Sequence, residues 1–263
     1  MTNFSSRFPA FFPSNAGGQD SRAGFRHGEK GTHSSRTLML SELGAVLGAA
    51  PRAAGRAAYA EAIVEGNCLQ KPTTSTRRLS AQRLSELYAL DPAVPLFRVL
   101  RALWDSDERS RPLLALLVAL ARDPLLRASV PPVLSLPVGA QLERKPLRDA
   151  LRHVVGERLN DATLDKVARN VASTWTQTGH LHGRTFKFRN KVEPRPLALA
   201  LALWIGEAAG FNGEDLFRTG WVAVLDCSPA AAKSVALDAK RLGVIDLRTA
   251  GDVIELRLDR LDP

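Results

Sequence analysis

Residues 160–191 have the sequence NDATLDKVARNVASTWTQTGHLHGRTFKFRNK, and this stretch decides the class of fold. From Leu164 to Trp175 apolar residues recur at i, i+3, i+4, i+7, i+8 and i+11, which is the spacing of one buried helical stripe. Thr178 and Gly179 end this helix, and residues 184–191 then alternate like a strand. A helix followed by a basic β-ribbon is how a winged helix presents itself to a duplex. The stretch therefore predicts a winged-helix-like element and makes nucleic acid the leading partner hypothesis.

The polar residues of this stretch form two groups of candidate DNA contacts. The outer helix face carries side chains that can hydrogen-bond to base edges or phosphates in or near the major groove. These residues are Lys166, Arg169, Asn170, Ser173 and Thr174. The ribbon supplies cations for phosphates or for the adjacent minor groove, namely Arg184, Lys187, Arg189 and Lys191. The alternatives are an ordinary solvated helix face and a solubilising edge strand, because exposed lysine hinders edge-to-edge pairing.

A third cationic group lies earlier in the chain. Thr74 or Ser75 can cap a helix with a buried stripe that includes Leu79, and the first acid of this helix is Glu86. Cations in a first helical turn interact unfavourably with the helix dipole, so another partner is expected to stabilise them. The phosphate backbone of a nucleic acid is one candidate, and the alternative is that the arginines are simply solvated. We expect a clamp on a second backbone segment by Arg77, Arg78 and Arg83.

The charge of the chain is concentrated around the opening stretch. The 263 residues carry 36 Lys and Arg against 27 Asp and Glu, a net charge of +9. Between Glu143 and Lys191 there are 11 basic and five acidic residues, a local surplus of six. A clustered surplus favours polyanionic partners such as DNA, RNA or an anionic membrane surface.

Several other functional classes find little support in the sequence. There is no phosphate-binding loop, dinucleotide glycine pattern or nucleophile elbow, so we expect no enzyme and no cofactor. His180 and His182 lack the cysteine or Glu-x-x-His partners of a metal site, so no metal is expected. No segment has the roughly 20 apolar residues of a membrane helix. Two distant cysteines, Cys68 and Cys227, favour a reducing compartment, so we expect a cytoplasmic protein without a membrane partner.

The fold class predicted is mainly α and multi-helical, with winged-helix-like elements of a helix plus a β-ribbon. Residues 1–35 lack periodicity and predict a disordered or loosely attached tail, whose phenylalanines could dock on the body or on a partner. The proline-rich residues 130–140 predict a connector and domain boundary. The expected parts beyond the tail are an N-terminal helical domain (36–135), a winged-helix-like basic element (140–192) and a C-terminal helical subdomain (193–263).

The C-terminal part repeats the order of helix and hairpin. Ser228 and Pro229 begin a helix through Leu242, and a hairpin is expected around Ala250 and Gly251. The charges of this hairpin are mixed in sign, which favours packing or protein contact over DNA binding.

The stretch AIVEGNCLQKPTTSTRRLSAQRLSELYAL resembles BrxA, the small helical component of BREX phage-defence systems. The similar features are Glu65, Asn67, Leu69 and Gln70, followed by a Ser/Thr run and basic residues that open a helix. SSRTLMLSELGAVL, PLLALLVALARDPLLRASV and LNDATLDKVARNVASTWTQTGHL are also similar in order and character. The resemblance covers roughly residues 35–185. It departs from the family at Gly66 and Cys68, which interrupt the polar motif, and in the long tail.

This resemblance implies a compact helical protein that binds double-stranded DNA and has no catalytic activity of its own. It also implies that the protein acts together with other BREX proteins, namely a methyltransferase, an ATPase and a phosphatase-like protein. Two alternatives stay open. One is an assembly adaptor whose basic faces meet acidic protein surfaces. The other is an RNA-binding factor similar to NusB-type antitermination proteins, in which Phe186 and Phe188 would stack on bases.

Overall fold

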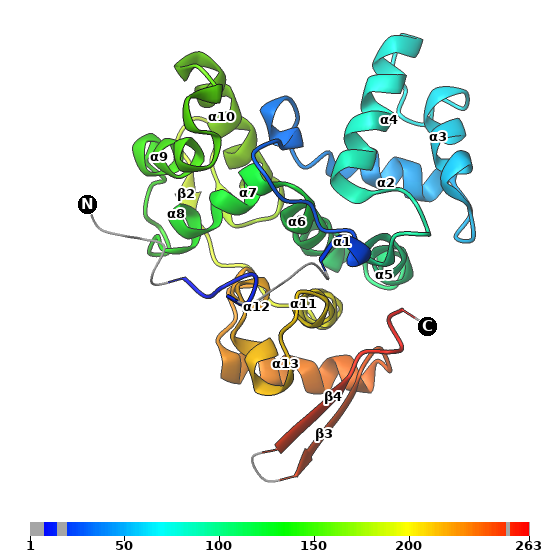
Figure 1. The fold of residues 1–263 in the computed structure, drawn as a ribbon, viewed down its shortest axis with the longest axis vertical. Coiled ribbons are helices and arrows are strands. Elements are labelled where there is room, and N and C mark those ends of the chain that lie inside the picture. Colours follow the sequence, from blue (N-terminus) through cyan, green and yellow to red (C-terminus); the bar gives the residue numbers. More distant parts are fainter. Residues whose placement is uncertain (1–7, 15–19, 251–252, 263) are drawn as a thin grey trace.

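Helices make up most of the computed structural model, which describes residues 8–14, 20–250 and 253–262 (Figure 1). Two small antiparallel sheets of two strands each accompany them in this part of the chain. One continuous set of buried apolar side chains runs from Phe25 to Leu261. The prediction of a mainly α, multi-helical fold is confirmed.

The first long helices end with a central helix in which residues 112–121 are all apolar. They are α2 (Leu40–Ala49), α3 (Arg56–Val64), α4 (Thr74–Tyr88), α5 (Pro95–Trp104) and α6 (Arg111–Arg122). All residues from Leu113 to Ala121 of α6 are buried, because α6 packs against α4, α5 and α11. A helix that is apolar on all sides has no face to offer to water, and α6 accordingly lies at the centre in Figure 1.

The middle of the chain has the element order of a winged helix. Its elements are α7 (Pro124–Ala128), α8 (Val130–Leu134), α9 (Arg144–Val155), α10 (Asp161–Gln177), β1 (Leu181–His182) and β2 (Phe188–Arg189). Before α9, Gln141 bridges to Phe188, and Leu142 N donates to Lys187 O at 2.8 Å. Three short extended segments and the helices α7, α9 and α10 therefore pack together. Of this arrangement, residues 160–191 predicted the helix and a β-ribbon after it.

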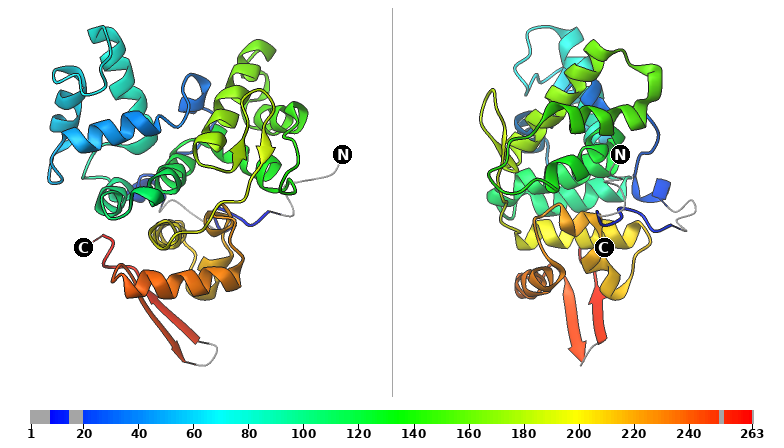
Figure 2. Two further views of the ribbon diagram at one scale, coloured as in Figure 1. Left: turned by 180° about the vertical axis from the view of Figure 1, so that it is seen from behind. Right: turned by 90° about the vertical axis from the view of Figure 1, so that its left-hand side faces the viewer.

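The C-terminal part repeats this order. It consists of α11 (Pro196–Ala208), α12 (Gly220–Ala223), α13 (Pro229–Arg241), β3 (Asp246–Ala250) and β4 (Val253–Arg257). Ser228 caps α13 by accepting from Ala231 N at 3.2 Å, as expected. The predicted hairpin is also present, with Ala250 opposite Val253, and Figure 2 shows it extending away from the helices. The turn at 251–252, which includes Gly251, lies outside the described residues.

The short helices are the following: α1 (Asp20–Ala23), η2 (Thr32–Ser34), η3 (Glu108–Ser110), η4 (Gly156–Arg158) and η5 (Gly213–Arg218).

The expectation of a disordered tail at 1–35 is wrong for the residues that the structure describes there. Phe11 and Phe12 pack edge-on against Trp221, with ring centroids 4.7 and 5.6 Å apart, and Phe25 is buried. Trp221 Nε1 also donates to Phe11 O at 2.7 Å. Aromatic rings bury enough apolar surface to offset the ordering of a polar segment. The phenylalanines thus dock on the body, while residues 1–7 and 15–19 lie outside the described part.

Three local expectations need correction. The connector expected at 130–140 begins with α8, because two prolines fit the first turn of a helix, where no N–H partner is needed. The cap of α4 is Thr73, which accepts from Thr76 N, in place of Thr74 or Ser75. Leu79 is not in the buried stripe, since 38% of its surface is exposed. The division into domains stays a prediction.

Candidate nucleic-acid interface

Helix α10 has the predicted amphipathic form. Asn160 caps it by accepting from Thr163 N at 2.8 Å. The apolar stripe from Leu164 to Trp175 is buried against neighbouring elements. The indole of Trp175 donates to Ser129 Oγ at 2.8 Å, which satisfies the one polar group of this stripe.

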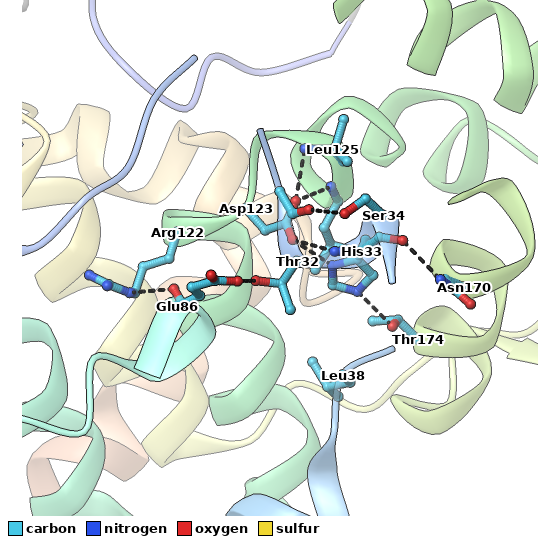
Figure 3. Close-up of polar contacts among 12 residues, drawn as sticks. Thr32, His33, Ser34, Leu38, Glu86, Arg122, Asp123, Leu125, Asn170 and Thr174 are labelled. Carbon is cyan, nitrogen blue, oxygen red and sulfur yellow. Dashed lines mark hydrogen bonds and ion pairs between the residues drawn. The ribbon is translucent and has the colours of Figure 1, made fainter. Parts of the chain in front are cut away.

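The short helix η2 covers one side of the polar face of α10 (Figure 3). Asn170 Nδ2 donates to His33 O at 2.9 Å, and Thr174 Oγ1 lies 2.8 Å from His33 Nε2. Thr174 is fully buried. The expected contact of Thr174 with DNA is therefore wrong for this arrangement, because its hydroxyl is buried and bonded within the protein. Asn170 is half-buried and uses one amide hydrogen in this way, so its contact with DNA stays a prediction. Periodicity showed that these residues are polar but could not show that a distant segment pairs with them.

His33 is the centre of a buried polar cluster. Its Nδ1 and its backbone N donate to Asp123 Oδ2 at 2.8 and 2.9 Å. Asp123 also caps α7, since its Oδ1 accepts from Leu125 N at 2.9 Å. This cluster was not predicted, because His33 lies in the expected tail and its partner lies 90 residues away. The available signal was the Asp123-Pro124 pair, which is typical of a helix start.

The cluster has the order of groups found in a hydrolase triad, with a hydroxyl, an imidazole and a carboxylate in a row. Thr174, His33 and Asp123 are however all fully buried. A substrate carbonyl cannot approach the Thr174 hydroxyl in this arrangement. The cluster therefore ties η2, α7 and α10 together and holds α10 in place.

The pKa of Asp123 predicts how acid acts on this cluster. Burial by itself raises that pKa. The charge and hydrogen bonds of His33 and the hydrogen bond from Leu126 N lower it by more, so the pKa of Asp123 lies below its ordinary value. Asp123 therefore stabilises the fold above its unfolded pKa of about 3.9 and loses this effect as pH falls through its lower folded pKa. Below about pH 4 the free energy of unfolding should fall more steeply in the parent than in Asp123→Asn, measured by urea unfolding at several pH values. A constant difference between the two proteins would contradict this.

The exposed part of α10 carries two of the predicted cations. Lys166 and Arg169 are exposed, Ser173 is half-buried, and neither cation forms an ion pair with a described residue. Lys166 lies one helical turn before Asn170, so it continues the polar face beyond the part that η2 covers.

The loop between β1 and β2 is held against the same helix. Lys187 Nζ donates to Thr176 Oγ1 at 2.9 Å and to Gly183 O at 3.2 Å. Gly183 has φ of +100°, and a Cβ there would lie 2.1 Å from Phe186 O, so this position requires glycine. Both Lys187 bonds go to neutral groups, which leaves its charge uncompensated beside α10. Arg184 is exposed in the same loop.

Two ribbon residues do not belong to this surface, and the expected alternation over 184–191 is wrong. Only Phe188 and Arg189 form a strand here, because Gly183 turns the chain and residues 184–186 bend. Arg189 is buried and pairs with Asp226, which also accepts from Val192 N at 2.8 Å. Arg189 therefore joins the hairpin to the C-terminal part and does not contact DNA in this arrangement.

Lys191 is exposed, but it lies on the side of the C-terminal part. Burial raises the pKa of the Cys227 thiol, and the nearby charge of Lys191 opposes this rise. The next residue, Val192, donates its N–H to Asp226 at 2.8 Å, so Lys191 lies at the junction with the C-terminal part.

The three arginines of α4 are in different environments. Arg77 donates to Val64 O at 2.7 Å, and Arg83 pairs with Glu86 at 2.8 Å, so both act inside the fold. Arg78 is exposed and has no ion pair within the described chain. Glu86 also accepts from Thr32 Oγ1 at 2.9 Å. Thus η2 lies between α4 and α10, as Figure 1 shows, and Arg78 lies on the helix across from Lys166 and Arg169.

One basic residue near this surface was missing from the predicted set. Arg144 begins α9, is exposed, and has no ion pair among the described residues. Leu142, two residues earlier, donates its backbone N–H to Lys187 O, so the start of α9 lies beside the β1–β2 loop. Its place in the cluster of charges was the signal that could have identified it.

The groove between α9 and α10, of about 470 Å³, has a different character. Arg148 pairs with Asp161 and Asp165, and Arg152 pairs with Asp161. These charges largely neutralise one another, and Arg144, which also lines the groove, is a cation there without an ion pair among the described residues. Within the described chain no three His, Cys, Asp or Glu side chains are grouped as metal ligands.

Four of the predicted cations and Arg144 therefore form a basic surface, whose side chains are exposed except for the half-buried Lys187. We call it the α10–loop surface, and it consists of Lys166, Arg169, Arg184, Lys187 and Arg144.

Comparison with known proteins leaves the family open. No model of a known protein family matches this chain. A search of curated proteins likewise gives no match. In the part of the chain that the structure describes, no helix combines the length and apolarity needed to span a bilayer. Function must therefore be argued from the α10–loop surface.

Proposed function

We propose that this protein binds double-stranded DNA through the α10–loop surface and catalyses no reaction. The observation that carries the proposal is the joining of Lys166 and Arg169 to the β1–β2 loop by the Lys187–Thr176 bond. Helix and loop thereby present uncompensated cations on one continuous surface. A duplex offers regularly spaced phosphates on both sides of its grooves, so this combination fits a helix in the major groove and a loop on the neighbouring backbone.

Arg78 extends the proposal to a second contact. It lies on α4, on the other side of η2 from α10, and is exposed without an ion pair among described residues. It would reach a more distant phosphate, whereas Arg77 and Arg83 would hold α4 in position. Four of the twelve predicted residues thus make contacts within the fold in place of contacts with DNA, namely Arg77, Arg83, Thr174 and Arg189.

The biological setting is proposed from the resemblance of residues 35–185 to BrxA. On that basis the protein would serve as a component of a BREX phage-defence system, beside a methyltransferase, an ATPase and a phosphatase-like protein. Deleting its gene from a host with a complete system should abolish phage restriction. Unchanged restriction would contradict this setting without affecting DNA binding.

The first experiment measures binding of duplex DNA, single-stranded DNA and RNA by fluorescence anisotropy at 50 and 200 mM salt. With about five phosphate contacts, duplex affinity should fall roughly 10²- to 10³-fold between these concentrations. Preference for single-stranded RNA would favour the antitermination-like alternative. Absence of binding to all three at 50 mM would contradict the proposal and favour the adaptor.

The second experiment locates the surface. Replacing Lys166, Arg169 and Arg184 together with alanine should weaken binding to all duplex sequences and lower the salt slope by about three. The matched control replaces Arg109, Lys240 and Arg248, which are exposed elsewhere and free of ion pairs among described residues. Both variants lose the same charge, so equal weakening would show that net charge alone drives binding and that this surface is not the site.

A further inference from the structure

Phe186 stands out among the exposed apolar side chains. It is 61% exposed, and it is the one aromatic residue among the large hydrophobic side chains exposed in the described chain. Phe188, two residues later, is half-buried and packs against His182 with ring centroids 5.7 Å apart. The hairpin therefore covers one of its two phenylalanines and leaves the other in water.

The loop that carries Phe186 is braced on both sides. Its stems pair at Leu181 with Arg189 and at His182 with Phe188, and Gly139 N donates to Arg189 O at 2.8 Å. Within the loop, Lys187 is bonded to Gly183 and to α10. In the right view of Figure 2 this yellow-green loop stands out at the edge of the molecule. Phe186 is thus displayed by an ordered turn, and little conformational freedom is left to lose on binding.

The charges around Phe186 suit a nucleic-acid groove. Arg184 and Lys187 lie on either side of it in the loop, and Arg144 lies at the adjacent start of α9. Cations beside an apolar tip can bind the phosphates that border a groove while the tip contacts base edges. Proteins that bend DNA from the minor groove insert apolar side chains, including phenylalanine, between base steps in this way.

We infer that Phe186 is a wedge that enters the minor groove of the bound duplex and partly unstacks one base step, so that the DNA is kinked on binding. This inference rests on the proposed DNA binding. It goes further in stating that the duplex is bent when it is bound. Flexible pyrimidine–purine steps unstack most easily, so binding favours duplexes with such a step under the loop. Sequence preference arises here without hydrogen bonds to base edges.

The test follows bending and binding in the same titration. A duplex of about 30 base pairs carries donor and acceptor dyes at its ends, and a second duplex carries 2-aminopurine at a TA step. At saturation the parent protein should shorten the end-to-end distance and raise 2-aminopurine fluorescence. Phe186→Ala should keep the salt slope of binding and lose both signals, whereas Phe186→Leu should retain them. The control Leu242→Ala removes an equally exposed apolar group from the C-terminal part and should behave like the parent.

The outcomes separate the two proposals. If the parent binds duplex with the expected salt slope but leaves it straight, or if Phe186→Ala bends it as the parent does, the wedge is overturned and DNA binding stands. If Phe186→Ala lowers affinity for single strands alone, Phe186 is a stacking platform and the wedge is likewise overturned. If the parent does not bind duplex at low salt, both proposals fall.

Discussion

Replacing His33 with alanine should lower the free energy of unfolding by about 3–5 kcal/mol, because the buried Asp123 carboxylate loses the imidazole and keeps only backbone N–H donors. The imidazole also accounts for one contact to the Thr174 hydroxyl. Without the imidazole, that hydroxyl and the carboxylate each lose a buried hydrogen-bond partner, and burial of unsatisfied polar groups is strongly unfavourable. The measurement is urea unfolding at pH 7, followed by circular dichroism.

A matched control separates this effect from the general loss of a histidine. His153 of α9 is exposed, and His153→Ala should change the free energy of unfolding by at most about 0.5 kcal/mol. A loss below about 1 kcal/mol in His33→Ala would mean that water or a rearranged side chain satisfies Asp123. The cluster would then not be what holds η2 against α10.

The second large effect is expected at Asp226. Asp226→Ala leaves the Arg189 guanidinium buried and unpaired, and it removes the acceptor for Val192 N. Breaking a buried pair by removing one partner costs about 3–5 kcal/mol. The φ of Asp226 is +53°, so alanine is disfavoured there and part of the loss is backbone strain. Asp226→Asn tolerates this conformation better and isolates the loss of charge.

The control for this prediction is a solvent-exposed pair. Asp149→Ala removes the partner of Lys145, whose side chain is 84% exposed, and should cost at most about 1 kcal/mol. If Asp226→Ala is no more harmful than Asp149→Ala, the burial of Arg189 is not an important part of the fold. The double variant Arg189→Met/Asp226→Ala should recover part of the lost stability, since it removes both charges.

Much of the fold was predictable because its signals are local. The α10 helix ends at Gln177, just before Thr178 and Gly179 as expected, since an apolar stripe and a helix-ending glycine act over short distances in the sequence. The β3–β4 hairpin likewise follows from alternation on both sides of a short turn. The α8 helix was missed because prolines in a first turn look the same in a sequence as prolines in a linker.

The candidate site was predicted only in part, and the reason is physical. Arg184 and Arg189 lie five residues apart and have the same chemistry, yet one is exposed and the other pairs with Asp226. What distinguishes them is a partner 37 residues further along, which no local pattern reveals. For the same reason Thr174 was assigned to DNA, although its hydroxyl lies against a histidine 141 residues away.

The cluster around His33 also imposes an order on the making of the protein. On the ribosome His33 is synthesised 90 residues before Asp123 and 141 residues before Thr174. At 5–20 residues per second, Thr174 is added about 7–28 s after His33. Throughout this interval residues 32–34 have no α10 to pack against, and the emerging chain has to keep its first helices from aggregating. The segment that holds α10 in place is thus made well before α10 and is among the last to find its partners.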